Sequence, residues 1–204
     1  MNPTTGIVAI TDRGWYEYLR AQSDLDEVNF WKPSAHRGLN APEFSPFFFK
    51  LKAPDNAICG FGYFARFARL PPWLAWESFG VGNGYGTLAA MTERIETIRS
   101  RIRYQRPTGP DLIGCVLIAS PVFFPESQWV RTPSDWRVRT QTDKRYDLTT
   151  GEGLRVWTDC QAQARGTWPV NPMFRAGSVS PMLLCTEASH GTTASGFRGN
   201  GEAA

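Results

Sequence analysis

Hydrophobic and polar positions over the first 30 residues predict a strand, a short helix and a second strand. The apolar run at 7–10 predicts the first strand, and Thr11 and Asp12 supply an N-cap for a helix. Trp15 and Leu19 then recur at helical spacing, before the extended stretch that follows.

A β-hairpin is the clearest local prediction. Residues 44–52 form an apolar run entered through a proline, 53–56 (Ala-Pro-Asp-Asn) is a strong turn signal, and 57–70 is a long strand pattern. Gly60 and Gly62 within it mark a bulge, a bend or a close backbone approach. The later part of 57–70 alternates imperfectly between apolar and polar residues, which indicates that part of this strand lies at a sheet edge.

The middle of the chain predicts two helices and a central strand. Residues 73–79 fit a short helix, and 80–86 is a glycine-rich loop without the Gly-Lys-Ser/Thr ending of a phosphate loop. Residues 88–102 form an amphipathic helix that Thr87 caps. The nearly continuous apolar run at 111–120 predicts a central strand buried on both faces, which we expect Pro121 to end.

The polar face of the 88–102 helix carries Arg94, Arg99 and Arg101. Such a face is usually solvated, and the alternative is a face that follows phosphates.

The chain changes character after Trp157. Short ordered segments at 144–147 and 154–157 come first, and then 25 of the last 47 residues are Gly, Ala, Ser, Thr or Pro. Such a composition buries too little apolar surface to offset the entropy of ordering. We therefore expect a domain over 1–157 and a poorly ordered tail over 158–204.

Composition suggests a globular binding protein. The 204 residues are 42% hydrophobic and 20% charged, and the eight Trp and thirteen Phe make aromatic content high. Net charge is +3, and 18 of the 22 cations are Arg, whose fork of donors suits phosphates and planar groups. That balance neither requires nor excludes nucleic acid.

The start of the chain is polar and no apolar run is long enough to span a membrane, so we expect a cytoplasmic protein without a membrane partner.

Catalytic chemistry is not evident in the residues. The only histidines are His36 and His190, the four cysteines form no C-x-x-C pair, and no Gly-x-Ser-x-Gly motif is present. Cys59 and Cys115 lie in apolar strands that keep a thiol neutral. We therefore predict no catalytic residue, no metal site and no cofactor, and expect a binding module.

The stretch 28–34 (Val-Asn-Phe-Trp-Lys-Pro-Ser) is the leading candidate for a site. Phe30 and Trp31 face opposite sides of a strand, so one is expected in the core while the other offers a ring to a ligand. Two interpretations stay open: a core strand with an exposed edge, or a base-stacking wall with polar groups that read base edges.

Five segments in this order and spacing resemble the N-terminal part of bacterial HNH endonucleases: VNFWKPS, FFFKLKAPDNAICGFGYFARFARLP, AWESFGVGNG, IGCVLIASPVFFPESQWVRTPSDW and YDLTTGEGLRVW. The resemblance covers residues 7–157 and implies an EVE-like domain of the PUA superfold. It implies an α+β fold with a mixed β-barrel and flanking helices. It also implies a reader that accepts a flipped modified cytosine, methylated or hydroxymethylated, in an aromatic-walled pocket.

The chain departs from that family after Trp157, where a nuclease half with a His-rich metal motif should follow. Only His190 is present there, and two interpretations of the tail stay open, a native end or a frameshifted or truncated one. We therefore carry over the reader and not the nuclease. The expected partners are DNA with modified bases and a separate nuclease, and the oligomeric state is left open.

Nine residues are candidates for nucleic-acid binding. Aromatic residues would supply stacking planes, polar residues would read base edges and cations would hold phosphates. They are Asn29, Phe30, Trp31, Lys32, Ser34, Arg37, Arg66, Trp76 and Trp129. For Trp15, Trp73 and Trp136 core packing is the preferred interpretation.

Three other functions compete with the modified-DNA reader. One is an intact restriction endonuclease acting alone, which the missing ligands argue against. Another is an RNA-binding PUA-like module, because folds of this kind also bind RNA. The last is a degenerate product that retains only the fold.

Overall fold

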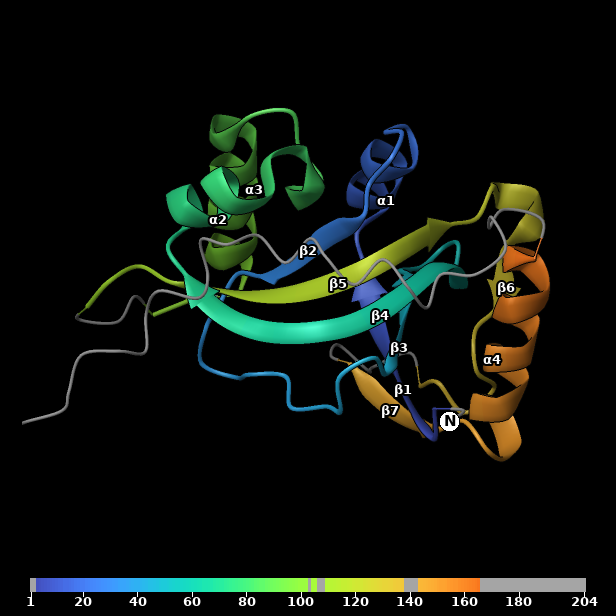
Figure 1. The fold of residues 1–204 in the computed structure, drawn as a ribbon. Helices are drawn as coiled ribbons and strands as arrows, with labels where there is room; N and C mark the ends of the chain where they lie inside the picture. Colours follow the sequence, from blue (N-terminus) through green and yellow to red (C-terminus); the bar gives the residue numbers. More distant parts are fainter. Residues whose placement is uncertain (1–2, 103, 106–108, 138–142, 166–204) are drawn as a thin grey trace, which may run out of the picture. The chain divides into compact units, whose positions relative to one another are not determined.

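A mixed β-sheet organises the part of the chain that the structure describes (Figure 1). The structure is a computed structural model that describes residues 3–102, 104–105, 109–137 and 143–165. Hydrogen bonding gives the strand order β2-β5-β4-β3-β1-β7, and β6 pairs with β4 off this path. The strands are β1 (Thr5–Thr11), β2 (Glu27–Lys32), β3 (Pro46–Leu51), β4 (Ala57–Leu70), β5 (Ile113–Phe123), β6 (Val130–Arg131) and β7 (Lys144–Asp147).

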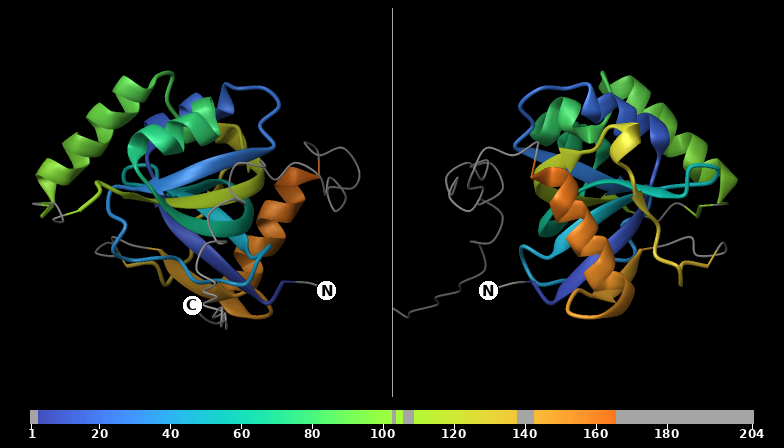
Figure 2. Two further views of the ribbon diagram at one scale, coloured as in Figure 1. Left: turned by 60° about the vertical axis from the view of Figure 1, so that its left-hand side comes forward. Right: turned by 90° about the vertical axis from the view of Figure 1, so that its right-hand side faces the viewer.

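The helices lie on different sides of this sheet, with α2 and α3 grouped together and α4 apart from them (Figure 2). Asp12 caps α1 by accepting a hydrogen bond from Gly14, and Thr87 caps α3 by accepting one from Ala90, so both predicted caps are confirmed. No helix within the described ranges is long and apolar enough to cross a membrane. The helices are α1 (Arg13–Arg20), α2 (Pro72–Phe79), η1 (Gly80–Asn83), α3 (Leu88–Arg101), η2 (Glu126–Gln128) and α4 (Gly151–Ala164).

The predicted hairpin is confirmed as the antiparallel pair β3–β4. Gly60 has a φ of +159°, and a Cβ built there would lie 2.2 Å from the carbonyl oxygen of Val122. At Gly62 the register between β4 and β5 shifts. Gly60 therefore marks a close backbone approach, as predicted, and Gly62 lies opposite a bulge of β5.

The class is α+β, as predicted, but the predicted barrel is not found. β1 and β3 are parallel and the other pairs are antiparallel, so the sheet is mixed. In the described part of the chain, the pairing path starts at β2 and ends at β7 without joining them. In the same described part of the chain, residues 64–70 of β4 pair with β5 on one side and with no strand on the other. This agrees with the prediction that part of this strand lies at a sheet edge.

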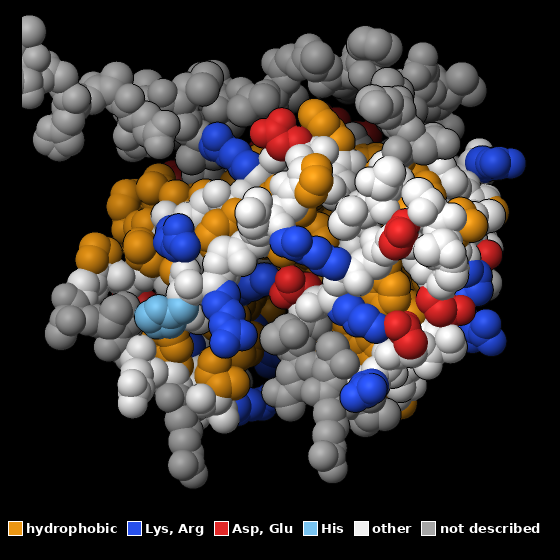
Figure 3. Space-filling model, turned by 90° about the horizontal axis from the view of Figure 1, so that it is seen from below, with side chains coloured by type: hydrophobic (Ala, Val, Ile, Leu, Met, Phe, Trp, Pro, Cys, Tyr) orange, Lys and Arg blue, Asp and Glu red, His pale blue; other side chains and the backbone are white. Residues whose placement is uncertain are grey.

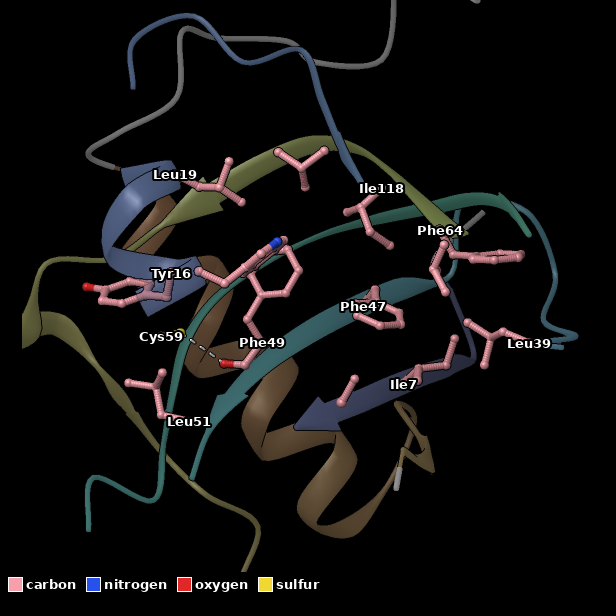
Figure 4. Packing of buried hydrophobic residues seen from close by; sticks show 14 residues of the cluster. Ile7, Tyr16, Leu19, Leu39, Phe47, Phe49, Leu51, Cys59, Phe64 and Ile118 are labelled. Carbon is pink, nitrogen blue, oxygen red and sulfur yellow. Dashed lines mark hydrogen bonds between the residues drawn. The ribbon is translucent and has the colours of Figure 1, made fainter. Parts of the chain in front are cut away.

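Three apolar clusters pack the helices against the sheet. One lies between α1 and the sheet, and its packing is shown in Figure 4. A second joins the sheet to α4 through Phe48, Phe61 and Trp157. The third lies under α2 and α3 and contains Met91 and Ile95. Phe-rich β3 serves two clusters because successive side chains of a strand point to opposite faces.

Two boundaries differ from the prediction. Pro121 does not end β5, which continues to Phe123. Ser120 and Pro121 together oppose Gly62 of β4 in a bulge, where a residue that cannot donate to the ladder is tolerated. The domain boundary predicted after Trp157 falls inside α4, where Cys160 and Ala164 are buried in the second cluster. Residues 166–204, most of the predicted tail, lie outside the described residues.

The 88–102 helix and the tryptophans also bring corrections. Arg99 is only 3% exposed although it lies on the predicted polar face, and Ile102 is 56% exposed although it extends the apolar stripe. Trp15 is buried in the core, as predicted. Trp73, predicted in the core, is 58% exposed on α2. Trp136 is partly exposed and packs against the second cluster.

Candidate nucleic-acid interface

The segment between β2 and β3, here the 33–45 loop, is fixed by arginines from three separate elements. Each arginine donates a hydrogen bond to a main-chain carbonyl oxygen, so the contacts hold the backbone of the loop rather than its side chains. The pairs are Arg99 of α3 to Pro33, Arg69 of β4 to Ala35, and Arg145 of β7 to Asn40.

Arg99 is the most elaborate of these anchors. Its guanidinium donates to Pro33 at 2.9 Å, pairs with Asp111 at 2.9 Å, and lies 4.7 Å from the ring centroid of Tyr104. It also pairs with Glu96 at 3.0 Å. Burial alone would lower the pKa of Arg99, but the interactions with Asp111 and Glu96 together outweigh it and raise the pKa, so the buried cation stays charged.

Three predicted residues lie on or beside this loop. Lys32 forms a 3.0 Å ion pair with Asp143, and both side chains are about three-quarters buried. The Ser34 hydroxyl accepts a 3.2 Å hydrogen bond from the amide of His36, which stabilises a local turn. Arg37 is exposed and forms no ion pair with any residue that the structure describes. Of these cations, Arg37 is thus the one available to an anionic ligand without breaking a contact.

Asn29, the predicted reader of base edges, lies inside the protein rather than on its surface. It is fully buried, and its Nδ2 donates to Asn83 Oδ1 at 2.9 Å. Asn83 in turn donates to the carbonyl oxygens of Ala75 and Gly80. The two amides therefore connect β2 to α2 and η1, and a base could reach Asn29 only after this connection opened.

Phe30 and Trp31 do face opposite sides of β2, as predicted. The Phe30 ring packs into the first cluster, with its centroid 5.0 Å from that of Phe47. The Trp31 indole packs against the third cluster and donates from Nε1 to the carbonyl oxygen of Asn83 at 3.1 Å. Trp31 remains partly exposed. It can offer a ring, but its N–H is already used.

The other three candidates do not all join this region. Trp76 packs against the same cluster as Trp31. Arg66 lies on β4 near Glu27. Burial raises the pKa of Glu27, and the Arg66 charge offsets only part of this effect. Trp129 precedes β6, at the other end of the sheet from α2, and donates to Tyr16 Oη at 3.1 Å. Trp129 therefore cannot form one pocket with Trp31.

Cations gather on the face that carries β7 and the 33–45 loop (Figure 3). The sequence analysis missed Arg69 and Arg145, which reach the loop carbonyls there. No local pattern identifies them, because the contacts join residues 34 and 105 positions apart. The excess of Arg over Lys was the only signal that planar donors are used here.

Reactive groups are buried or dispersed. Among the residues described, no group of three or more His, Cys, Asp and Glu side chains is placed to hold a metal ion. Burial raises the pKa of the Cys115 thiol to about 11, and the Cys59 thiol is shifted in the same direction. Both thiols are therefore protonated near neutral pH.

Comparison with known proteins assigns no family. No family model and no curated protein matches the chain. Among solved structures, ASCH from Zymomonas mobilis aligns over 74% of this chain and 94% of its own, with 11% identity and a TM-score of 0.45. Two single-residue variants of that protein align over the same 74%, with TM-scores of 0.43 and 0.42 and identities of 10% and 11%.

Proposed function

We propose that this chain is a DNA-binding module that recognises a modified cytosine, methylated or hydroxymethylated, through the 33–45 loop. The observation that carries the proposal is the fixing of this loop by three arginines to main-chain carbonyls. A loop held in this way loses little conformational entropy when it binds. The sequence resemblance over 7–157 supplies the ligand class.

Different residues support different parts of recognition. Arg37 is exposed and would pair with a phosphate, with Lys32 and Arg66 as further candidates. The Ser34 hydroxyl has donor capacity left for a base edge, since the structure uses it as an acceptor. Trp31, and Trp76 on the same cluster, would offer the aromatic surface against which an extruded base stacks.

In this proposal the chain supplies recognition to a modification-dependent restriction system, and cleavage comes from a separate nuclease. The proposal requires no catalytic residue, metal or cofactor in the described part of the chain.

The test compares matched labelled duplexes that carry cytosine, 5-methylcytosine or 5-hydroxymethylcytosine at a single position, at several salt concentrations. We expect tighter binding to a modified duplex at every salt concentration. Phosphate contacts alone give salt-sensitive binding that is blind to the modification. Equal affinity for all three duplexes would remove the modified-base claim. Tighter binding to a matched RNA would instead favour the RNA-reader alternative.

Two variants separate the binding of phosphates from the recognition of the base. Arg37→Ala should weaken binding to all duplexes alike and reduce the salt slope by about 0.9, the value for one phosphate contact on duplex DNA. Ser34→Ala should reduce the preference for the modified duplex and leave the salt slope unchanged. Arg20→Ala, which removes an exposed cation at the end of α1, is the matched control and should change neither quantity.

A further inference from the structure

A hollow of about 590 Å³ lies beside β7, apart from the residues assigned above. Its volume is within the range of small-molecule sites. Its lining combines a tryptophan with cations, a combination found where proteins hold single nucleotides. The lining residues are Ser134, Asp135, Trp136, Arg137 and Lys144.

Trp136 is held in place by a rigid turn. Its amide donates to the carbonyl oxygen of Pro133 at 3.0 Å, and the amide of Ser134 donates to Glu152 at 2.7 Å. Arg155 of α4 pairs with Glu152 and donates to the carbonyl oxygens of the two residues before Pro133. These bonds hold the main chain that carries Trp136, and its indole packs against the second cluster, which lowers the entropic cost of stacking a ligand on it.

A buried cation lies against the same ring. Lys50 is 2% exposed, and its Nζ lies 5.4 Å from the Trp136 ring centroid. The ammonium donates to Leu51 O at 2.8 Å and to Asn56 Oδ1 at 3.1 Å, and burial lowers its pKa. No carboxylate of the described residues pairs with Lys50. Its charge is only weakly screened, so it favours an anion nearby.

The rim of the hollow carries an excess of positive charge. Asp135 accepts hydrogen bonds from Lys144 and from the hydroxyl of Tyr146, and the Lys144 bond is the main reason that the pKa of Asp135 is lowered. Arg137 is exposed and has no ion pair with another described residue. The lining thus carries two cations and one carboxylate, and the buried Lys50 against the Trp136 ring adds a further positive charge nearby.

We propose that this hollow is a nucleotide-binding subsite that stacks one base on Trp136 and pairs the adjacent phosphate with Arg137 and Lys144. The proposal rests on the proposed binding of nucleic acid, but not on recognition of a modified base. A stacking plane with an electropositive rim accepts any base, because every base has a π-face. It fits an unpaired nucleotide of any sequence.

The strand β7 separates this subsite from the 33–45 loop. Asp143, directly before β7, pairs with Lys32, and Arg145 bonds to the carbonyl of Asn40. Lys144, between them, faces the opposite way and lines the hollow. The hollow is therefore a second surface, on the other face of β7 from the loop.

The test measures binding of the full chain to a short fluorescein-labelled single-stranded oligothymidine by anisotropy, over a series of salt concentrations. Trp136→Ala should weaken binding about 5- to 160-fold, the loss expected for one base–aromatic stack. Trp136→Phe should retain most of the affinity because it keeps a ring. Arg137→Ala should reduce the salt slope by about 0.7, the value for one phosphate on a single strand.

Trp73→Ala is the control, because Trp73 is an exposed tryptophan on α2. It should leave the affinity of the oligothymidine unchanged. Equal affinities of Trp136→Ala and Trp73→Ala would overturn the proposal. An unchanged salt slope for Arg137→Ala would also overturn the proposal. Because Arg137 is exposed, this variant still tests the proposal if Trp136→Ala does not fold.

The two proposals fail in different experiments. If the wild-type chain binds modified and unmodified duplexes with equal affinity, only the proposed function fails. A wild-type chain that discriminates duplexes, but whose single-strand binding ignores Trp136 and Arg137, counts against the subsite alone.

Discussion

Replacing Asn83 by Ala is expected to separate the scaffold of this fold from its recognition surface. Asn83 is fully buried in η1 and holds β2 to α2 through side-chain hydrogen bonds. If Asn29 serves this scaffold, as the structure indicates, the two asparagines are coupled in stability. If Asn29 instead reads a base, the effects of the two substitutions on the free energy of unfolding should be independent.

The magnitude follows from the bonds that are lost. The substitution leaves Asn29 Nδ2 as a buried donor without its 2.9 Å acceptor, which costs about 1–3 kcal/mol. The bonds to Ala75 O and Gly80 O disappear as well, each worth about 1 kcal/mol, although partly exposed Gly80 can bond to water instead. We expect a total loss of about 2–4 kcal/mol.

Urea unfolding of Asn29→Ala, Asn83→Ala and the double variant measures this coupling, with Ser78→Ala as control. Ser78 has a single hydroxyl bond within α2, and its loss should cost less than about 1 kcal/mol. Asn83→Ala should cost less in the Asn29→Ala background, because no orphan amide remains there. Additive effects, or a loss below about 0.5 kcal/mol for Asn83→Ala, would refute this explanation.

Three further substitutions test other parts of the fold. Gly60→Ala should destabilise the protein in urea by at least about 2 kcal/mol, because the new Cβ meets the carbonyl oxygen of Val122. Glu152→Gln should flatten the loss of thermal stability at acid pH. The hydrogen bond from Arg155 lowers the Glu152 pKa to about 2 from 4.5, so its contribution is complete above 4.5 and lost as pH falls towards 2. Arg99→Met should cost about 1–3 kcal/mol and speed tryptic cleavage in the 33–45 loop, which mass spectrometry locates.

Each of these predictions has a contrary result. Gly109→Ala, where a Cβ meets open space, is the control for Gly60→Ala, and equal stabilities of the two would contradict the steric argument. An acid stability profile of Glu152→Gln identical to that of the wild type would show that this carboxylate does not titrate as described. Unchanged cleavage of the loop in Arg99→Met would mean that Arg99 is not an anchor.

Local signals predicted the elements well because their causes are local. Asp12 and Thr87 cap helices whose first amides lie two or three residues away. The 53–56 turn and the long apolar run after it were sufficient for the hairpin. Pro121 was misinterpreted because it lies in a bulge of β5, and that bulge is defined only by the pairing of β5 with β4.

The candidate site could be predicted only in part because its contacts are long-range. Arg99 reaches Pro33 across 66 positions, and Asn29 meets Asn83 across 54. Periodicity assigns a residue to a helix face but does not reveal what covers that face, so Arg99 was expected in solvent. The stretch 28–34 was identified, yet its residues divide between a core, a helical layer and a loop.

The arginines that fix the 33–45 loop have a consequence for how this surface can change. They bind main-chain carbonyls, which every amino acid provides, so the path of the loop does not depend on the side chains at Ala35 or Arg37. Exposed positions of the loop are thus open to substitution without rebuilding the domain. The exposed surface of the loop and the stability of the fold can then vary independently, which makes this loop a suitable place to randomise in a selection for new binding properties.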